Sequence, residues 1–127
     1  MVGILIVSHS RKIAEGVLEL AEQMTQGKIP LAAAGGTPDG ALGTSADLIR
    51  AAAEQLPADE ILVLLDLGSA AMSAEIALEG FERPYLLSNA PLVEGAMLAS
   101  VEASVGADLQ QTAAAAEQAR HLPKVQS

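Results

Sequence analysis

The chain has 127 residues and a formal net charge of −9, from 7 basic and 16 acidic residues. This charge disfavours nucleic acids and anionic membrane surfaces as partners, because few cations are available to neutralise phosphates. Cysteine is absent, which excludes disulfides and thiol chemistry but says little about the compartment. The apolar start lacks the basic leader of a signal peptide, so a cytoplasmic protein is expected. We expect one domain over residues 1–122 with an aliphatic core, followed by a loose tail at 123–127.

The first half of the chain predicts two strands and two helices. The aliphatic run Val2–Ser8 predicts a strand buried on both faces, and a helix is expected over residues 10–26. The inner face of that helix should carry the large apolar side chains at helical spacing, Ile13, Val17, Leu20 and Met24. A weaker strand at 30–34 and a turn-rich loop at 35–43 follow, and Thr44 or Ser45 should cap a second helix that runs to about Leu56.

The second half continues the alternation of strands and helices. A strongly apolar strand is predicted at residues 60–66, and Gly68 and Ser69 lead into a helix that runs through Phe81. A short strand at 84–88 precedes a helix at about 92–105 and an alanine-rich helix at 108–121. This pattern predicts an α/β fold, a small doubly wound and mainly parallel sheet of about four strands flanked by about five helices. We expect the strand order 2-1-3-4.

His9 is the leading candidate for chemistry. In the order 2-1-3-4 a ligand crevice opens at the carboxyl ends of the first and third strands, where Ser8, His9, Ser10 and Asp66 lie. A neutral imidazole is a nucleophile, and the N–H groups at an adjacent helix start favour anions. We therefore predict that His9 accepts a phosphoryl group while Asp66 orients its ring. A purely structural histidine and a helix-capping aspartate are the alternatives.

Five further residues are expected to line the crevice: Gly35, Gly36, Thr37, Gly68 and Ser69. Glycines let backbone amides approach a ligand closely, although the segment 35–37 is equally consistent with a plain flexible turn. Two histidines without cysteine argue against a metal site, and His121 is assigned a structural role. The helix at 93–105 is apolar or small nearly all round, which predicts burial or a subunit contact and favours a homodimer.

Four stretches of the sequence together resemble a known family. They are GILIVSHS at 3–10, AGGT at 34–37 with LGTS at 42–45, LDLGSA at 65–70 with MSAE at 72–75, and NAPLVEGA at 89–96. These motifs are similar to those of the phosphocarrier subunits of bacterial PEP-dependent dihydroxyacetone kinases. Those subunits are mannose-type IIA domains of the phosphotransferase system. The resemblance covers nearly the whole chain, in order.

The resemblance implies a phosphoryl relay. In such a relay the phosphocarrier HPr, charged from PEP by enzyme I, would phosphorylate His9, with Asp66 as the partner of the ring. The phosphoryl group would pass to ADP held with Mg in the nucleotide-binding subunit of dihydroxyacetone kinase, so that this chain itself binds no cofactor. Some relatives carry fused HPr-like domains, whereas here HPr is expected to act in trans.

Two other classes of function are open from the residues alone. One is a non-enzymatic regulatory module such as a receiver domain, with Asp66 as the acceptor. By resemblance a receiver has an acidic pair after its first strand and a later lysine, whereas here Ser8-His9 replaces the pair and no lysine occurs between Lys28 and Lys124. The other is a module that binds a small metabolite in the same crevice.

Overall fold

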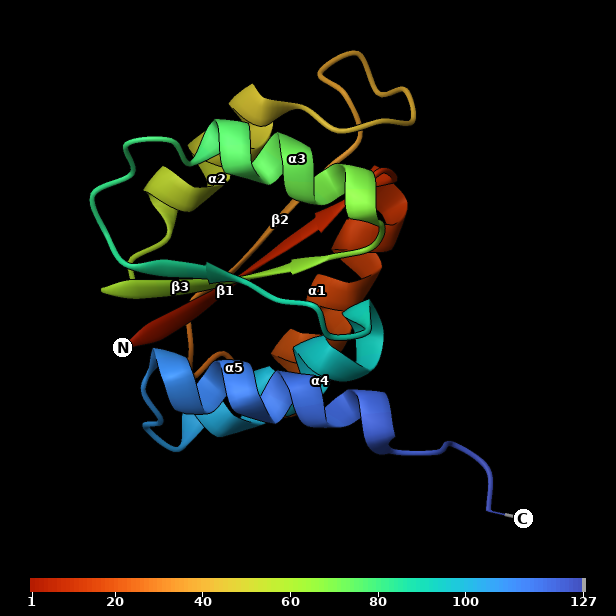
Figure 1. Ribbon diagram of the computed structural model, residues 1–127, viewed down its shortest axis with the longest axis vertical. Coiled ribbons are helices and arrows are strands. Elements are labelled where there is room, and N and C mark those ends of the chain that lie inside the picture. The colour runs from red at the N-terminus through yellow and green to blue at the C-terminus, as the bar shows by residue number, and fades with distance from the viewer. Residues whose placement is uncertain (127) are drawn as a thin grey trace.

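The computed structural model describes residues 1–126. A four-stranded sheet lies between two layers of helices (Figure 1). Its strands are β1 (Val2–Ser8), β2 (Leu31–Gly35), β3 (Glu60–Leu65) and β4 (Tyr85–Leu87). They are ordered β2-β1-β3-β4, and every neighbouring pair is parallel. The predicted fold class and strand order are therefore confirmed.

Five α-helices and one short 3-10 helix cover the sheet. They are α1 (Arg11–Thr25), α2 (Ala46–Gln55), α3 (Gly68–Ala77), α4 (Leu92–Ser104), α5 (Leu109–Gln118) and the 3-10 helix Ala119–His121. Helices α2 and α3 lie on one face, and α1, α4 and α5 lie on the other (Figure 1). No helix within residues 1–126 is long and apolar enough to cross a membrane. One residue of the predicted tail, Ser127, falls outside the described part of the chain.

Strand β1 is the centre of both hydrophobic clusters. Ile4 and Ile6 point into the cluster under α1, α4 and α5, while Leu5 and Val7 point into the cluster under α2 and α3. Because successive side chains of a strand face opposite ways, a strand buried on both faces must be apolar at every position. His9 is the first residue after this strand that is partly exposed, and it lies at the edge of the sheet.

The predicted inner face of α1 is wrong for three of its four residues. Ile13, Leu20 and Met24 are each 50% exposed, and only Val17 is buried. The buried positions are otherwise taken by small side chains, Ala14, Ala21 and Thr25. Helix α1 lies so close to β2 that a Cβ added at Gly35 would come within 2.9 Å of the Ala14 Cβ. This close approach leaves room for alanine and excludes the larger side chains.

Helix α3 ends at Ala77, four residues before the predicted end at Phe81. Gly80 has a φ of +73°, a left-handed conformation that does not continue a helix. The Arg50 guanidinium donates hydrogen bonds to the carbonyls of Ala77 and Glu79, at 3.2 and 3.0 Å. Two carbonyls at the carboxyl end of α3 thereby accept hydrogen bonds from a side chain of α2.

Strand β1 has the predicted bounds, and, apart from the end of α3, the other boundaries agree with the predictions or differ by at most three residues. Strand β2 covers 31–35 instead of 30–34, β4 covers 85–87 instead of 84–88, and α5 becomes a 3-10 helix after Gln118. Pro30 and Pro84 still belong to the ladder as acceptors, because their carbonyls accept from the N–H groups of Ile4 and Ile61, each at 3.0 Å. Proline at the first residue of a strand can accept but not donate.

Candidate active site

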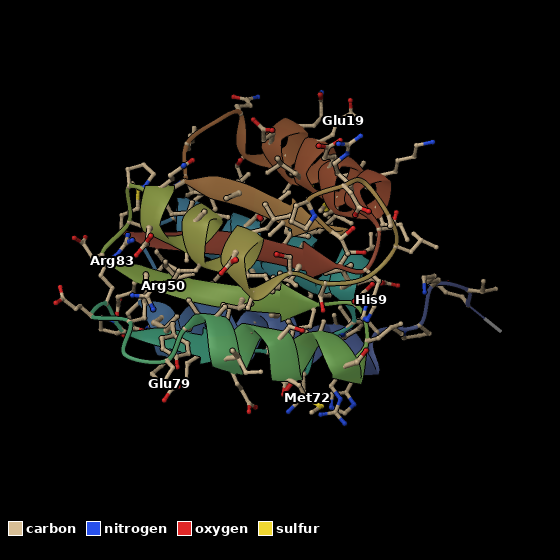
Figure 2. The ribbon with its side chains drawn as sticks, turned by 90° about the horizontal axis from the view of Figure 1, so that it is seen from above. His9, Glu19, Arg50, Met72, Glu79 and Arg83 are labelled. Atoms are coloured by element: carbon tan, nitrogen blue, oxygen red, sulfur yellow. The ribbon has the colours of Figure 1, made fainter. Side chains whose placement is uncertain are left out.

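His9 lies at the carboxyl end of the strands, where the sheet passes into α1. Figure 2 shows it at this edge, with Arg50 and Arg83 toward the opposite end of the molecule. Ser8, the last residue of β1, is fully buried, whereas the His9 side chain is 27% exposed. The His9 carbonyl accepts a hydrogen bond from the Gly43 N–H at 2.8 Å, which fixes the backbone from which the ring projects.

Asp66 follows β3 and lies directly beside His9. Its Oδ2 accepts from the Ser8 hydroxyl at 2.9 Å and from the His9 backbone N–H at 2.8 Å. Its Oδ1 lies 3.0 Å from His9 Nδ1 and accepts from the Leu67 N–H at 2.7 Å. The structure therefore brings together the two residues that the sequence singled out.

The charge of Asp66 decides where the ring proton sits. Desolvation raises the pKa of Asp66, but hydrogen bonds from the His9 backbone, the His9 ring and the Ser8 hydroxyl outweigh it, so the pKa lies below its ordinary value. An ionised carboxylate can only accept, so Nδ1 must carry the proton that lies between them. The lone pair of the neutral ring is then on Nε2.

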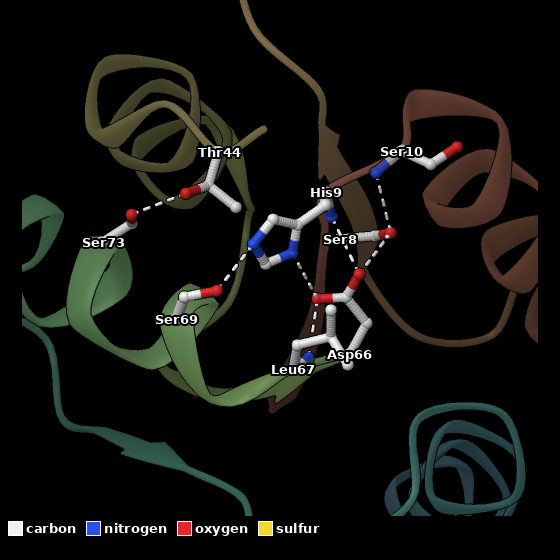
Figure 3. A network of polar contacts seen from close by, with 8 residues as sticks. All are labelled: Ser8, His9, Ser10, Thr44, Asp66, Leu67, Ser69 and Ser73. Carbon is white, nitrogen blue, oxygen red and sulfur yellow. Dashed lines mark hydrogen bonds and ion pairs between the residues drawn. The ribbon is translucent and has the colours of Figure 1, made fainter. Parts of the chain in front are cut away.

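Nε2 points toward the start of α3. It lies 2.7 Å from the Ser69 Oγ, and with the proton on Nδ1 the hydroxyl donates to Nε2 (Figure 3). Helix α3 begins at Gly68 without a side-chain cap, unlike α1, α2 and α5, which Ser10, Ser45 and Asp108 cap. The first N–H groups of an uncapped helix favour an anion. Gly68 and Ser69 thus lie on the side of the ring where a phosphoryl group on Nε2 would be.

Ser8 and Ser10, on either side of His9 in the sequence, hold the surroundings of the site by hydrogen bonds. The Ser8 hydroxyl donates to Asp66 and accepts from the Ser10 N–H at 3.0 Å. The Ser10 Oγ accepts from the Ile13 N–H at 3.2 Å, which makes Ser10 the N-cap of α1. Ser8 therefore positions Asp66, and Ser10 anchors the helix that starts beside it.

The segment 35–37 packs beside the site, and its own contacts are structural. The Gly36 N–H donates to the Ser8 carbonyl at 3.2 Å, and Gly35 lies against the start of α1. Thr37 hydrogen-bonds Asp39 and accepts from the Ala41 N–H at 3.1 Å, which closes its own turn. The backbone contact from this loop to His9 is made by Gly43, which the sequence interpretation did not select.

Two hydroxyl residues of the site were missed. Thr44 and Ser73 lie with their hydroxyl oxygens 2.6 Å apart, on the Nε2 side of the ring (Figure 3). Thr44 was considered as a possible cap and as part of the motif LGTS, but not as a site residue, and the cap is Ser45, whose Oγ accepts from the Leu48 N–H at 3.2 Å. The available signal was the spacing of Ser73 from Ser69, because residues four apart share one helix face.

A small hollow borders the other side of Asp66. It has a volume of about 180 Å³ and lies between the ends of β3 and β4, with Ser88 and Asn89 in its lining. The Ser88 Oγ accepts from the Ala90 N–H at 3.0 Å and so closes its own turn. Within residues 1–126 there is no cluster of three or more His, Asp or Glu side chains able to hold a metal ion.

Comparisons with known proteins identify the family of this chain. The family model "EIIA-man: PTS system fructose IIA component" matches residues 3–113. The phosphotransferase subunit DhaM of the PTS-dependent dihydroxyacetone kinase of Lactococcus lactis is 40% identical over 108 residues, which cover 85% of this chain and 87% of the relative. The phosphoryl donor subunit DhaM of the PEP-dependent dihydroxyacetone kinase 2 of Listeria innocua is 41% identical over 110 residues, which cover 83% of this chain and 88% of the relative.

Other relatives are much longer. The phosphoryl donor subunit DhaM of Escherichia coli is 44% identical over 119 residues, but these residues are only 25% of its length. The crystal structure of EF1359, a protein of unknown function, superposes with a TM-score of 0.78 at 38% identity and covers 92% of this chain and 93% of its own. The resemblance inferred from the motifs is confirmed: this chain belongs to the EIIA-man family, in the group of DhaM phosphotransferase subunits.

Proposed function

We propose that this chain is a phosphohistidine carrier that accepts a phosphoryl group on Nε2 of His9. The observation that carries the proposal is the pair of ring contacts, Nδ1 at 3.0 Å from the Asp66 carboxylate and Nε2 at 2.7 Å from the Ser69 hydroxyl. The carboxylate holds the proton on Nδ1, so the nucleophilic lone pair faces the helix start that can receive an anion. The donor is HPr, which is charged from PEP.

In the proposed step Nε2 attacks the phosphorus of the phosphohistidine on HPr. The N–P bond to the donor ring breaks as the bond to Nε2 forms, and the donor ring leaves with its electron pair. The His9 ring keeps the proton on Nδ1 and becomes formally cationic, and the adjacent Asp66 carboxylate offsets that charge. The same charge makes the ring a good leaving group in the next transfer, to ADP.

Ser69 changes its acceptor during this step. Before transfer its hydroxyl proton is directed at Nε2. Once Nε2 is bonded to phosphorus it has no lone pair left, so the hydroxyl turns to a phosphoryl oxygen. The uncapped N–H groups of Gly68 and Ser69 add neutral donors to the same group.

The downstream part of the proposal comes from the relatives. Several relatives are named as phosphoryl donor subunits of PEP-dependent dihydroxyacetone kinases. We infer that this chain transfers its phosphoryl group to ADP, which is bound with Mg in the nucleotide-binding subunit of such a kinase. The chain then binds no nucleotide or metal itself and works in the cytoplasm, as expected from its sequence.

Asp66 is less suited to be the acceptor, as a receiver-like module would require. Its two oxygens already accept from four donors, and its side chain is only 14% exposed. An attacking carboxylate would have to give up these bonds. Acid–base lability separates the two, because phosphohistidine survives base and phosphoaspartate does not.

The experiment is incubation with PEP, enzyme I and HPr, followed by mapping of the phosphorylated residue by mass spectrometry. We expect base-stable phosphate on His9 and none on His9→Gln. His121→Gln, which alters the chain's other histidine, is the matched control and should be phosphorylated normally. Stoichiometric phosphate on the His9→Gln protein would contradict the proposal. Adding the nucleotide-binding subunit with ADP to the phosphorylated wild type tests the onward transfer.

The homodimer expected from the helix at 93–105 stays a prediction. Helix α4 packs against α1 and α5, and its buried residues are small: Gly95, Ala96, Ala99, Ser100 and Ala103. This packing accounts for much of its apolar character. Val93 and Val101 remain 41% and 42% exposed and are the part of α4 left for a partner.

A further inference from the structure

Thr44 and Ser73 approach the site from two different elements. Thr44 directly follows Gly43, whose N–H donates to the His9 carbonyl at 2.8 Å. Ser73 comes four residues after Ser69, whose Oγ lies 2.7 Å from Nε2. Four residues advance a helix by about 6 Å on one face, so Ser73 lies just beyond Ser69 along α3. The pair thus stands outward of Nε2, in the direction in which a phosphoryl group would extend (Figure 3).

A count of protons leaves this pair with a free donor. Each hydroxyl has one proton and two lone pairs, and the bond between the two oxygens uses one proton. Neither hydroxyl makes another hydrogen bond within residues 1–126. One O–H group is therefore available, and because either oxygen can be the donor, it can be presented from either side. Both residues are only partly buried, so an anion on Nε2 can reach them.

We propose that Thr44 and Ser73 form the outer wall of the phosphoryl pocket and donate this free proton to a phosphoryl oxygen on His9. The inference rests on the proposed function and extends it to two residues. Hydrogen bonds to an ionised oxygen are stronger than those between neutral groups, so the pair favours the phosphorylated state. A purely structural hydrogen bond between the segment before α2 and helix α3 is the competing role, and its loss would affect folding alone.

The test uses the double variant Thr44→Val/Ser73→Ala, because a single deletion would leave one hydroxyl whose proton is still free. Thr44→Ser, which keeps both hydroxyls, is the matched control. Ser104→Ala is the remote control, since its hydroxyl bonds the Val101 carbonyl on α4. The measurement is the equilibrium distribution of phosphate between HPr and His9, together with the half-life of the phosphohistidine after PEP is removed. The urea midpoint of each variant is measured in parallel.

We expect the double variant to be phosphorylated on His9 but to shift the equilibrium toward phospho-HPr by roughly tenfold, the loss of one charge-assisted hydrogen bond. Thr44→Ser and Ser104→Ala should stay within about twofold of the wild type. The ³¹P resonance of the phosphohistidine should move in the double variant and stay in place in Thr44→Ser and Ser104→Ala. If the hydrogen bond between Thr44 and Ser73 is only structural, its loss should lower the urea midpoint and leave the equilibrium and the resonance unchanged.

Two negative outcomes are distinguishable. An unchanged equilibrium in a double variant that still carries phosphate on His9 would overturn this inference and leave the proposed function standing. A wild-type chain that takes no phosphate on His9 would overturn both. Ser73→Ala places a better helix former within α3, so loss of folding is not expected from that substitution.

Discussion

Replacing Asp66 by Asn tests whether the carboxylate sets the tautomer of His9. An Asn amide accepts at one oxygen only, so its NH₂ group must face two of the four donors that Asp66 now satisfies. With the amide oxygen toward Ser8 and the His9 N–H, the NH₂ group faces Nδ1. Nδ1 can then accept only if the ring proton moves to Nε2, and in that tautomer Nε2 has no lone pair for phosphorus.

The magnitude follows from the number of bonds affected. Each hydrogen bond to the ionised carboxylate is worth about 1.5–3 kcal/mol, and one of the two displaced donors can rearrange toward water, so the free energy of unfolding should fall by about 2–3 kcal/mol. The transfer rate should fall by roughly 10²–10⁴-fold, the usual effect of removing an orienting or acid–base group. Both effects should appear together, because they have one cause.

The assay is rapid-quench transfer from phospho-HPr, combined with urea unfolding and ¹⁵N NMR of the His9 ring nitrogens. Asp59→Asn is the control, because Asp59 is exposed, pairs with the amino terminus and precedes β3 at the opposite end of the strands. It should transfer normally. A transfer rate for Asp66→Asn within threefold of the wild type would refute the tautomer argument, whatever happens to stability.

Three further predictions concern packing, pH and assembly. Gly35→Ala would bring a Cβ within 2.5 Å of the Ser10 carbonyl oxygen and should lower the free energy of unfolding in urea by at least about 2 kcal/mol. Gly16→Ala, whose Cβ would have nothing within 4 Å, should raise it by up to about 1 kcal/mol, and equal urea midpoints for the two variants would contradict the packing. The pKa of Asp66 in the folded chain lies below its unfolded value of 3.8, so its contribution to stability is complete above pH 3.8 and is lost as the pH falls through the folded pKa. Acid should therefore lower the urea midpoint of the wild type more steeply than that of Asp66→Asn, and an equal dependence of the two midpoints on pH would exclude this linkage. Sedimentation at tens of micromolar should show a wild-type dimer and a folded Val101→Glu monomer, and a monomeric wild type would end the dimer hypothesis.

The strand order and the pairing of His9 with Asp66 could be predicted because they follow from chain order. Parallel strands connected by helices bring their carboxyl ends to one edge, so polar residues after two neighbouring strands must meet there. Neither prediction required knowledge of side-chain packing. The same holds for the capping role of Ser45, where one of two adjacent hydroxyl residues had to start α2.

The face of α1 could not be read from the sequence because large apolar residues gave the stronger helical pattern. Ile13, Leu20 and Met24 fit a helical stripe as well as Ala14 and Ala21 do, and only the close approach of α1 to Gly35 selects the small side chains. Thr44 and Ser73 were missed for a similar reason. Their contact joins residues 29 positions apart, and its partners are set by how α2 and α3 lie on the sheet.

The donors around His9 are all neutral, and this has a thermodynamic consequence. Within residues 1–126 the hydrogen bonds to the His9 ring and to Asp66 come from serine hydroxyls, backbone N–H groups and the ring itself, and none comes from a lysine or arginine side chain. A cationic clamp would hold a dianionic group tightly and lower the free energy released when it leaves. Hydroxyls and backbone N–H groups hold it more weakly. Under the proposed function, a phosphohistidine held in this way keeps a high transfer potential, so that the group stays exchangeable with the donor and still leaves readily for the next acceptor.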